Sequence, residues 1–128
     1  MGRSYRDLRV WRESIELSVA IYNLTRSFPK DEQFGLTSQL RRAAVSLASN
    51  IAEGYGRASR PDFRRFAAMA RGSLLEMQTQ LTIAIRLGLA EETRMQSVLA
   101  TTEDIGKMLW ALMTKLDAER RIDAVSGA

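Results

Sequence analysis

The positions of the prolines constrain this 128-residue chain most, because proline begins or ends a helix and is excluded from its interior. Pro29 and Pro61 are the only two, and between these breaks the apolar residues recur every three or four positions. That period is typical of one face of an α-helix, and no segment alternates like a β-strand. The pattern predicts four helices: one over about residues 6–27, a second from Gly35 to Gly54, a third from Ser59 to Gly88, and a fourth from Glu91 onward.

Local signals support these boundaries. Ser4 followed by Asp7 is a variant of the capping box, and Ser59 is a good N-cap ahead of Pro61. Short connections between long helices favour an antiparallel four-helix bundle, an all-α fold. We expect a single domain over residues 1–121, a short turn at 30–33, and a disordered C-terminal tail over 122–128.

The chain lacks two residue types that many catalytic and metal-binding sites require. The chain has no cysteine and no histidine, which excludes zinc fingers, haem and iron–sulfur ligation, thiol nucleophiles and Ser-His-Asp triads. We therefore expect no cofactor, no metal site and no enzymatic activity. One catalytic alternative stays open, in which Glu53 and Glu76 meet between helices as a carboxylate pair for acid–base work.

The charge is carried by arginine. The net charge is +4, and sixteen of the nineteen basic residues are arginines, the side chain best suited to bidentate phosphate contact. Six arginines either have no acid three or four residues away or lie in or beside the glycine-rich loop around residue 55. They are the candidate nucleic-acid-binding residues: Arg41, Arg42, Arg57, Arg60, Arg64 and Arg71. The alternatives are that they are solvated or pair with acids on other helices, such as Glu53 or Glu76.

Polar residues also recur at helical spacing on two of the predicted helices. Ser46, Asn50 and Glu53 share one face, and a similar spacing returns some 25 residues later. We expect an interhelical hydrogen-bond network that fixes how the helices pack, with a ligand site as the alternative. Its members are Gln39, Ser46, Asn50, Glu53, Ser73, Glu76 and Gln80.

The apolar pattern is wider than one core needs. The first helix carries two apolar stripes, and Trp110 lies off the main stripe of the fourth helix. Such width indicates either a broad core or an oligomer interface.

The N-terminus has no apolar signal-peptide core, and no apolar stretch is long enough to cross a bilayer. We expect a cytoplasmic protein with no membrane partner.

Several motifs resemble a known family. They include Asp7-Leu8-x-Val10-Trp11, Gln39-Leu40-Arg41-Arg42-Ala43-Ala44, Asn50-Ile51-Ala52-Glu53-Gly54 and Gly72-Ser73-Leu74-x-Glu76. Together they are similar to the four-helix-bundle family of 23S ribosomal RNA intervening-sequence proteins. That family includes the accessory variability protein of diversity-generating retroelements. The resemblance covers about residues 7–116, and in it Arg41 and Arg42 match a basic pair while Asn50 and Glu53 match a polar block.

The resemblance implies a homopentamer arranged as a barrel and a role without catalysis. In the retroelement branch it implies binding of nucleic acid and of a partner reverse transcriptase through a basic surface. Our hypothesis is a homo-oligomeric accessory protein that contacts RNA or DNA phosphates through arginines. The alternative is a structural oligomer or protein-interaction module with no nucleic-acid role.

Overall fold

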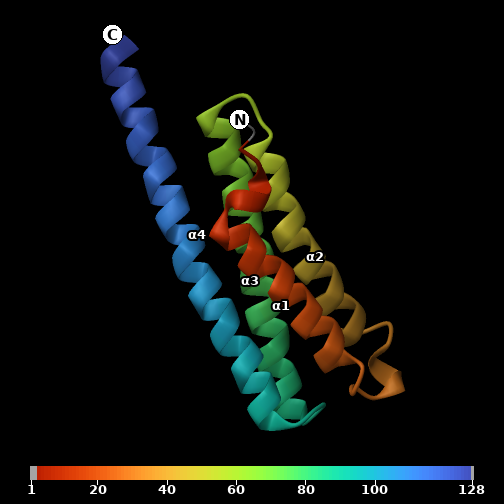
Figure 1. The fold of residues 1–128 in the computed structure, drawn as a ribbon. Helices are drawn as coiled ribbons and strands as arrows, with labels where there is room; N and C mark the ends of the chain where they lie inside the picture. Colours follow the sequence, from red (N-terminus) through yellow and green to blue (C-terminus); the bar gives the residue numbers. More distant parts are fainter. Residues whose placement is uncertain (1–2, 128) are drawn as a thin grey trace.

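A computed structural model describes residues 3–127 of the chain, with side chains up to residue 119. Over this range the protein is a four-helix bundle, as predicted (Figure 1). The long helices are α1 (Arg9–Thr25), α2 (Leu36–Tyr55), α3 (Arg60–Leu87) and α4 (Glu92–Gly127). Single turns of 3-10 helix, η1 (Tyr5–Asp7) and η2 (Lys30–Glu32), precede α1 and α2, and the second of these falls on the predicted short turn.

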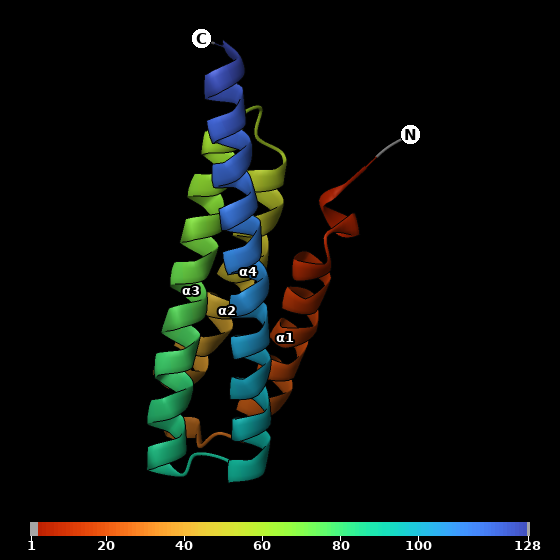
Figure 2. The same ribbon diagram turned by 90° about the vertical axis from the view of Figure 1, so that its left-hand side faces the viewer.

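Successive helices run antiparallel because their connections are short, and each helix packs against two others (Figures 1 and 2). α2 and α4 each contact α1 and α3, and the contact between α2 and α3 is the most extensive of all. The centre of the bundle is filled by large side chains that the solvent does not reach. They include Leu17, Ile21, Leu40, Leu47, Met77, Leu81, Ile105 and Leu109.

The first helix begins later than the sequence predicts. Ser4 and Asp7 do form a capping box: the Ser4 N–H donates to Asp7 Oδ2 at 3.0 Å, and Ser4 Oγ accepts from the Arg6 N–H at 3.2 Å. These bonds close the single turn η1, and Leu8 is extended, with φ −76° and ψ 122°. The capping residues therefore cap a separate turn, and α1 starts only at Arg9.

The C-terminal segment also differs from the expectation of a disordered tail over 122–128. The backbone of α4 is helical as far as Gly127, and Ala128 lies outside the described residues. The physical reason is local: no proline or glycine interrupts the sequence between Leu116 and Gly127, so nothing stops the helix earlier. In Figure 1, α4 extends beyond the other helices at the end where the N-terminus lies.

Gly54 permits the close approach of α2 and α3. A Cβ added there would lie 2.7 Å from Phe66 Cβ and 3.0 Å from Phe63 Cδ1, so only glycine fits between the helices. Gly72, in the middle of α3, has no such neighbour. Apart from the adjacent residues and the backbone of α3 itself, no atom lies within 4 Å of a Cβ built there, so no neighbouring helix of the protomer explains this glycine.

We predict that Gly54→Ala destabilises the protein by about 1–3 kcal/mol, because the added methyl group must push α2 and α3 apart. The control is Gly56→Ala, two residues further on, where the added Cβ would meet only Glu53 O at 3.6 Å and Ala52 O at 3.7 Å. That variant should stay within about 0.5 kcal/mol of the parent. Urea unfolding of the three proteins measures both values, and equal stabilities would show that the α2–α3 contact does not need glycine.

Candidate nucleic-acid interface

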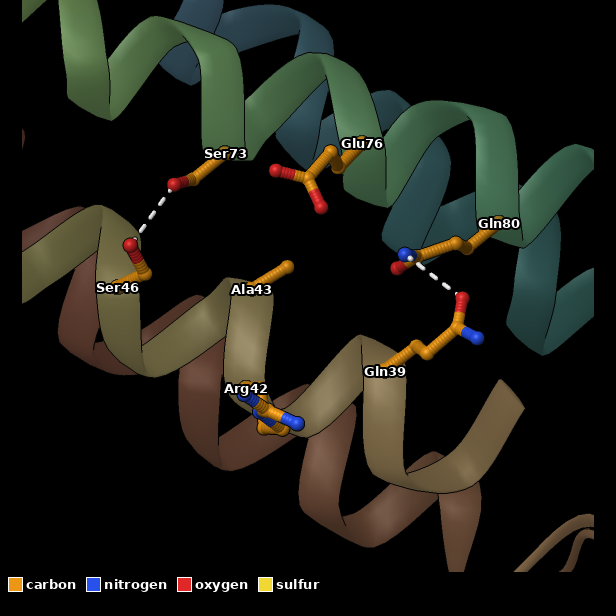
Figure 3. A pocket seen from close by; sticks show the side chains of 7 residues that line it. All are labelled: Gln39, Arg42, Ala43, Ser46, Ser73, Glu76 and Gln80. Atoms are coloured by element: carbon orange, nitrogen blue, oxygen red, sulfur yellow. Dashed lines mark hydrogen bonds between the residues drawn. The ribbon is translucent and has the colours of Figure 1, made fainter. Parts of the chain in front are cut away.

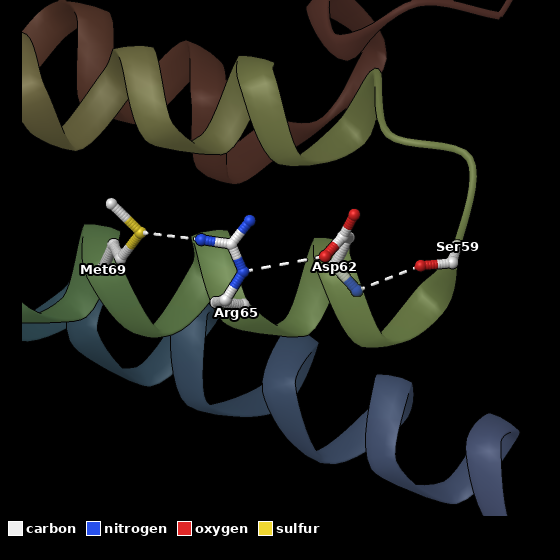
Figure 4. Close-up of polar contacts among 4 residues, drawn as sticks. All are labelled: Ser59, Asp62, Arg65 and Met69. Atoms are coloured by element: carbon white, nitrogen blue, oxygen red, sulfur yellow. Dashed lines mark hydrogen bonds and ion pairs between the residues drawn. The ribbon is translucent and has the colours of Figure 1, made fainter.

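Four arginines gather at one end of the bundle, where α2 is followed by α3. Arg57 lies in the connecting loop, and Arg60, Arg64 and Arg65 lie on the first two turns of α3. We call these four residues the arginine end. Ser59 fixes the start of α3 there, since its side chain accepts a hydrogen bond from the Asp62 N–H at 3.2 Å (Figure 4).

The ring of Phe66 holds two of these guanidinium groups. The Cζ atoms of Arg57 and Arg65 each lie 4.7 Å from the ring centroid, while Phe66 itself is buried. Asp62 and Met69 hold Arg65 further, with Nε 3.6 Å from the Asp62 carboxylate and Nη1 4.0 Å from the Met69 sulfur (Figure 4). Among the described side chains, Arg57 has no acidic partner. Stacking on a ring leaves the N–H donors at the edge of a guanidinium group available to an oxygen ligand.

Arg60 and Arg64 pair with acids on α4, which spacing along α3 alone does not show. Arg60 Nε lies 3.0 Å from Glu119 Oε2, and Arg64 Nε lies 3.1 Å from Asp117 Oδ1. These contacts correspond to the alternative in which the arginines pair with acids on other helices. Their cross-helix partners are acids of α4, in place of the suggested Glu53 and Glu76.

Arg41 and Arg42 are neighbours in sequence but have different environments. Arg41 turns toward α1, where its Nε donates to Thr25 Oγ1 at 2.9 Å and its guanidinium group lies 4.6 Å from the Tyr22 ring centroid. Arg42 is exposed, has no ion-pair partner among the described side chains, and lines a groove between α2 and α3. The sequence gives the two residues the same role, and the structure separates them.

The six predicted arginines do not form one surface. Arg71 extends toward α4, with its guanidinium group 5.5 Å from the Trp110 ring centroid, on the same side of α3 as the α4-paired arginines. Arg41 faces α1, on the other side of the bundle, and Arg42 faces the α2–α3 groove. One arginine outside the six candidates belongs with the arginine end. Arg65 has Asp62 three residues earlier, so it does not count as an arginine without a nearby acid.

Part of the predicted polar network is made between α2 and α3 (Figure 3). The hydroxyl groups of Ser46 and Ser73 lie 2.9 Å apart, and Asn50 Nδ2 donates to Ser46 Oγ at 3.1 Å. About two helical turns from the serine pair, Gln80 Nε2 donates to Gln39 Oε1 at 3.4 Å. The other two members, Glu53 and Glu76, make no hydrogen bond to any described side chain and are exposed.

These contacts also fix the antiparallel register, which separates the two glutamates. Ser46 lies opposite Ser73, so Glu53 on α2 lies level with Phe66 on α3. Glu76 is then about ten residues further along α3, roughly 15 Å away at 1.5 Å per residue. The carboxylate pair that was the catalytic alternative is therefore not assembled.

The groove between α2 and α3 has a volume of about 370 Å³ and a polar lining. Ala43 forms its floor, and Glu76 extends into the hollow above that alanine (Figure 3). Gln80 is only 8% exposed, and its Oε1 is buried with no hydrogen-bond partner. The complete lining is Gln39, Arg42, Ala43, Ser46, Ser73, Glu76 and Gln80.

Two kinds of feature are absent from the described part of the chain. No three acidic side chains there come close enough together to hold a metal ion. None of the helices there combines the length and the hydropathy that a membrane span requires.

Comparison with known proteins places the chain in a family. Residues 6–111 match the family described as 23S rRNA-intervening sequence protein. A crystal structure of a protein of unknown function from the S23 ribosomal protein family of Bacteroides thetaiotaomicron VPI-5482 is similar, with a TM-score of 0.73 and 25% sequence identity. The alignment covers 81% of this chain and 97% of that one. No functionally curated protein matches the chain. Because the family match spans most of the sequence, the chain belongs to the 23S rRNA-intervening sequence protein family.

Proposed function

We propose that the protein is a non-enzymatic, homo-oligomeric nucleic-acid-binding protein that contacts RNA or DNA phosphates through the arginine end. The observation that carries this proposal is the pair of guanidinium groups stacked around Phe66, of which that of Arg57 has no acidic partner among the described side chains. A planar guanidinium group held on a ring binds a phosphate with little loss of side-chain entropy. Phosphate contacts of this kind depend on salt, because each one releases counterions from the nucleic acid.

Self-association is the second part of the proposal. The outer face formed by α3 and α4 exposes Leu75 by 44%, Ile83 by 45% and Trp110 by 58%. Apolar side chains gathered in this way are typical of a protein–protein interface. A second copy of the chain is the expected partner, and the family resemblance favours a pentamer.

A second candidate function is supported by the arginines whose guanidinium groups already contact other residues of the protomer. Arg41, Arg60 and Arg64 form contacts within the protomer, which favours a structural oligomer or protein-interaction module. Its partner would be another protein, and for the retroelement branch of the family that partner is a reverse transcriptase. Binding of nucleic acid at low salt separates the two functions.

We predict that Arg57→Ala with Arg65→Ala weakens binding of a single-stranded oligonucleotide and lowers the slope of log K against log salt by about 2, one for each lost phosphate contact. Fluorescence anisotropy at several salt concentrations measures both effects. The matched control is Arg26→Ala with Arg86→Ala, which removes two exposed arginines at the opposite end of the bundle. If the parent does not bind at low salt, or if both double variants bind equally well, the arginine end is not the interface.

Arg41 and Arg42 provide a separate test of structural against binding roles. Arg41→Ala should lower the free energy of unfolding by about 1 kcal/mol, because it removes the hydrogen bond to Thr25 and the contact with Tyr22. Arg42→Ala should leave stability unchanged, since its side chain is exposed. Urea unfolding of the two single variants gives the comparison, and a larger loss for Arg42→Ala would contradict these assignments.

The oligomeric state is tested by measuring the molar mass of the protein in solution. Light scattering should give a multiple of 14.4 kDa, five times that value for a pentamer. Replacing an exposed apolar side chain with a charged one should dissociate the assembly, so Trp110→Glu is expected to yield a smaller species with unchanged helicity. Val45→Glu, on an exposed apolar residue of α2 outside this face, is the control. A monomeric parent protein would refute self-association.

A further inference from the structure

The α2–α3 groove contains a buried acceptor that the protein does not satisfy. Gln80 is 8% exposed, its Nε2 donates to Gln39, and its Oε1 has no partner. A buried amide oxygen without a donor costs free energy, whereas a ligand that supplies an N–H group removes this cost. The groove is therefore suited to a ligand with donors to offer.

A carboxylate stands next to this acceptor. Glu76 precedes Gln80 by one helical turn on the same face of α3 and extends into the hollow over Ala43 (Figure 3). Among the described side chains it has no ion-pair partner. Glu76 therefore presents two acceptor oxygens on one wall, next to the buried amide oxygen of Gln80.

The opposite wall supplies donors. Arg42 lines the groove from α2, is exposed and has no ion-pair partner among the described side chains. It does not pair with Glu76, although both line the same groove. A fitting ligand therefore carries N–H donors on one edge and acceptors beside them.

We propose that this groove binds a guanine base, presented by an unpaired nucleotide of a nucleic acid or by a free guanine nucleotide. Guanine has two adjacent donor nitrogens, N1 and N2, and next to them the acceptors O6 and N7. The donors face the Glu76 carboxylate, beside which Gln80 Oε1 lies buried, and Arg42 takes O6 and N7 in the bidentate manner usual for this pair. Where the guanine belongs to a nucleic acid, the inference rests on the proposed function.

Other ligands match the two walls less well. Cytosine and adenine each offer a single amino group on this edge, and uracil offers one N–H between two carbonyl oxygens. An arginine or amine would satisfy Glu76 but would be repelled by the Arg42 guanidinium group. Unpaired bases are bound by proteins through these same edges, so the recognition is of an ordinary kind.

The groove is aligned with the arginine end. Arg65, Met69, Gly72 and Glu76 are spaced by four, three and four residues, so they lie along one face of α3. Arg65 and Glu76 are about 16 Å apart along the helix, a span of a few nucleotides. Gly72 between them has no side chain to obstruct a strand. A strand whose phosphates contact the arginine end can thus place a base in the groove.

The test uses changes of single atoms in the ligand. A short oligouridylate with one central guanosine is compared with the same strand carrying inosine, which lacks only the N2 amino group. We expect the inosine strand to bind the intact protein about tenfold more weakly. A strand with 7-deazaguanosine, which lacks the N7 acceptor, should also bind more weakly. Equal binding of the guanosine and inosine strands would overturn the proposal.

Protein variants test whether the preference for guanosine over inosine arises in the groove. Glu76→Ala should abolish the preference for guanosine over inosine, because it removes the acceptor of the N2 amino group that distinguishes the two bases. Glu53→Ala, which removes an exposed glutamate about 15 Å away, should keep the preference. If Glu76→Ala keeps it as well, the base is not read here.

Free nucleotides separate this inference from the proposed function. Guanosine monophosphate should shift the NMR signal of the Ala43 methyl group on the groove floor, and inosine monophosphate should shift it much less. A shift without any oligonucleotide binding would support the guanine site and refute the nucleic-acid function. Oligonucleotide binding with no guanine preference and no shift would refute the guanine site alone.

Discussion

The close approach of α2 and α3 determines where both candidate binding surfaces, the groove and the arginine end, are formed. Small residues on α2 make it possible, above all Gly54, where even a methyl group would meet Phe66 at 2.7 Å. The same approach sets Ser46 against Ser73 and Gln39 against Gln80. It also places Phe66 at the junction, where the ring brings Arg57 from the loop and Arg65 from α3 together. The register, the groove and the arginine end thus depend on one helix pair.

The sequence predicted the fold well because the relevant information is local. The apolar period, two prolines and the glycines at the helix ends define four helices, and Ser59 and Gly88 cap α3 where expected. The errors arose where a local signal had two structural meanings. Ser4 and Asp7 are a capping box in either case, but Leu8 is extended, so the box belongs to a separate turn. The tail beyond residue 121 lacks an apolar pattern, yet it also lacks a helix breaker before Gly127.

The candidate site was predicted less completely, because charge pairing is a property of the assembled bundle. A search three and four residues along one helix finds Asp62 beside Arg65 but not Asp117 beside Arg64 or Glu119 beside Arg60. Helical spacing predicted which polar residues share a face, and Ser46, Asn50 and Ser73 do meet. The antiparallel register decides which residues of two helices are level with each other, and it separates Glu53 from Glu76. The unsatisfied oxygen of Gln80 could not have been inferred without it.

The two surfaces beside the α2–α3 contact suit different tasks. At the arginine end, cations stack on a ring near acids that neutralise several of them, so the excess charge that remains is small. Such a surface favours weak contact with any phosphate and does not distinguish sequences. The groove has acceptors on one wall and a donor on the other, with a buried oxygen that requires a donor. Because phosphate contacts position a nucleic acid and base contacts select it, the arginine end would hold a strand and the groove would choose the base.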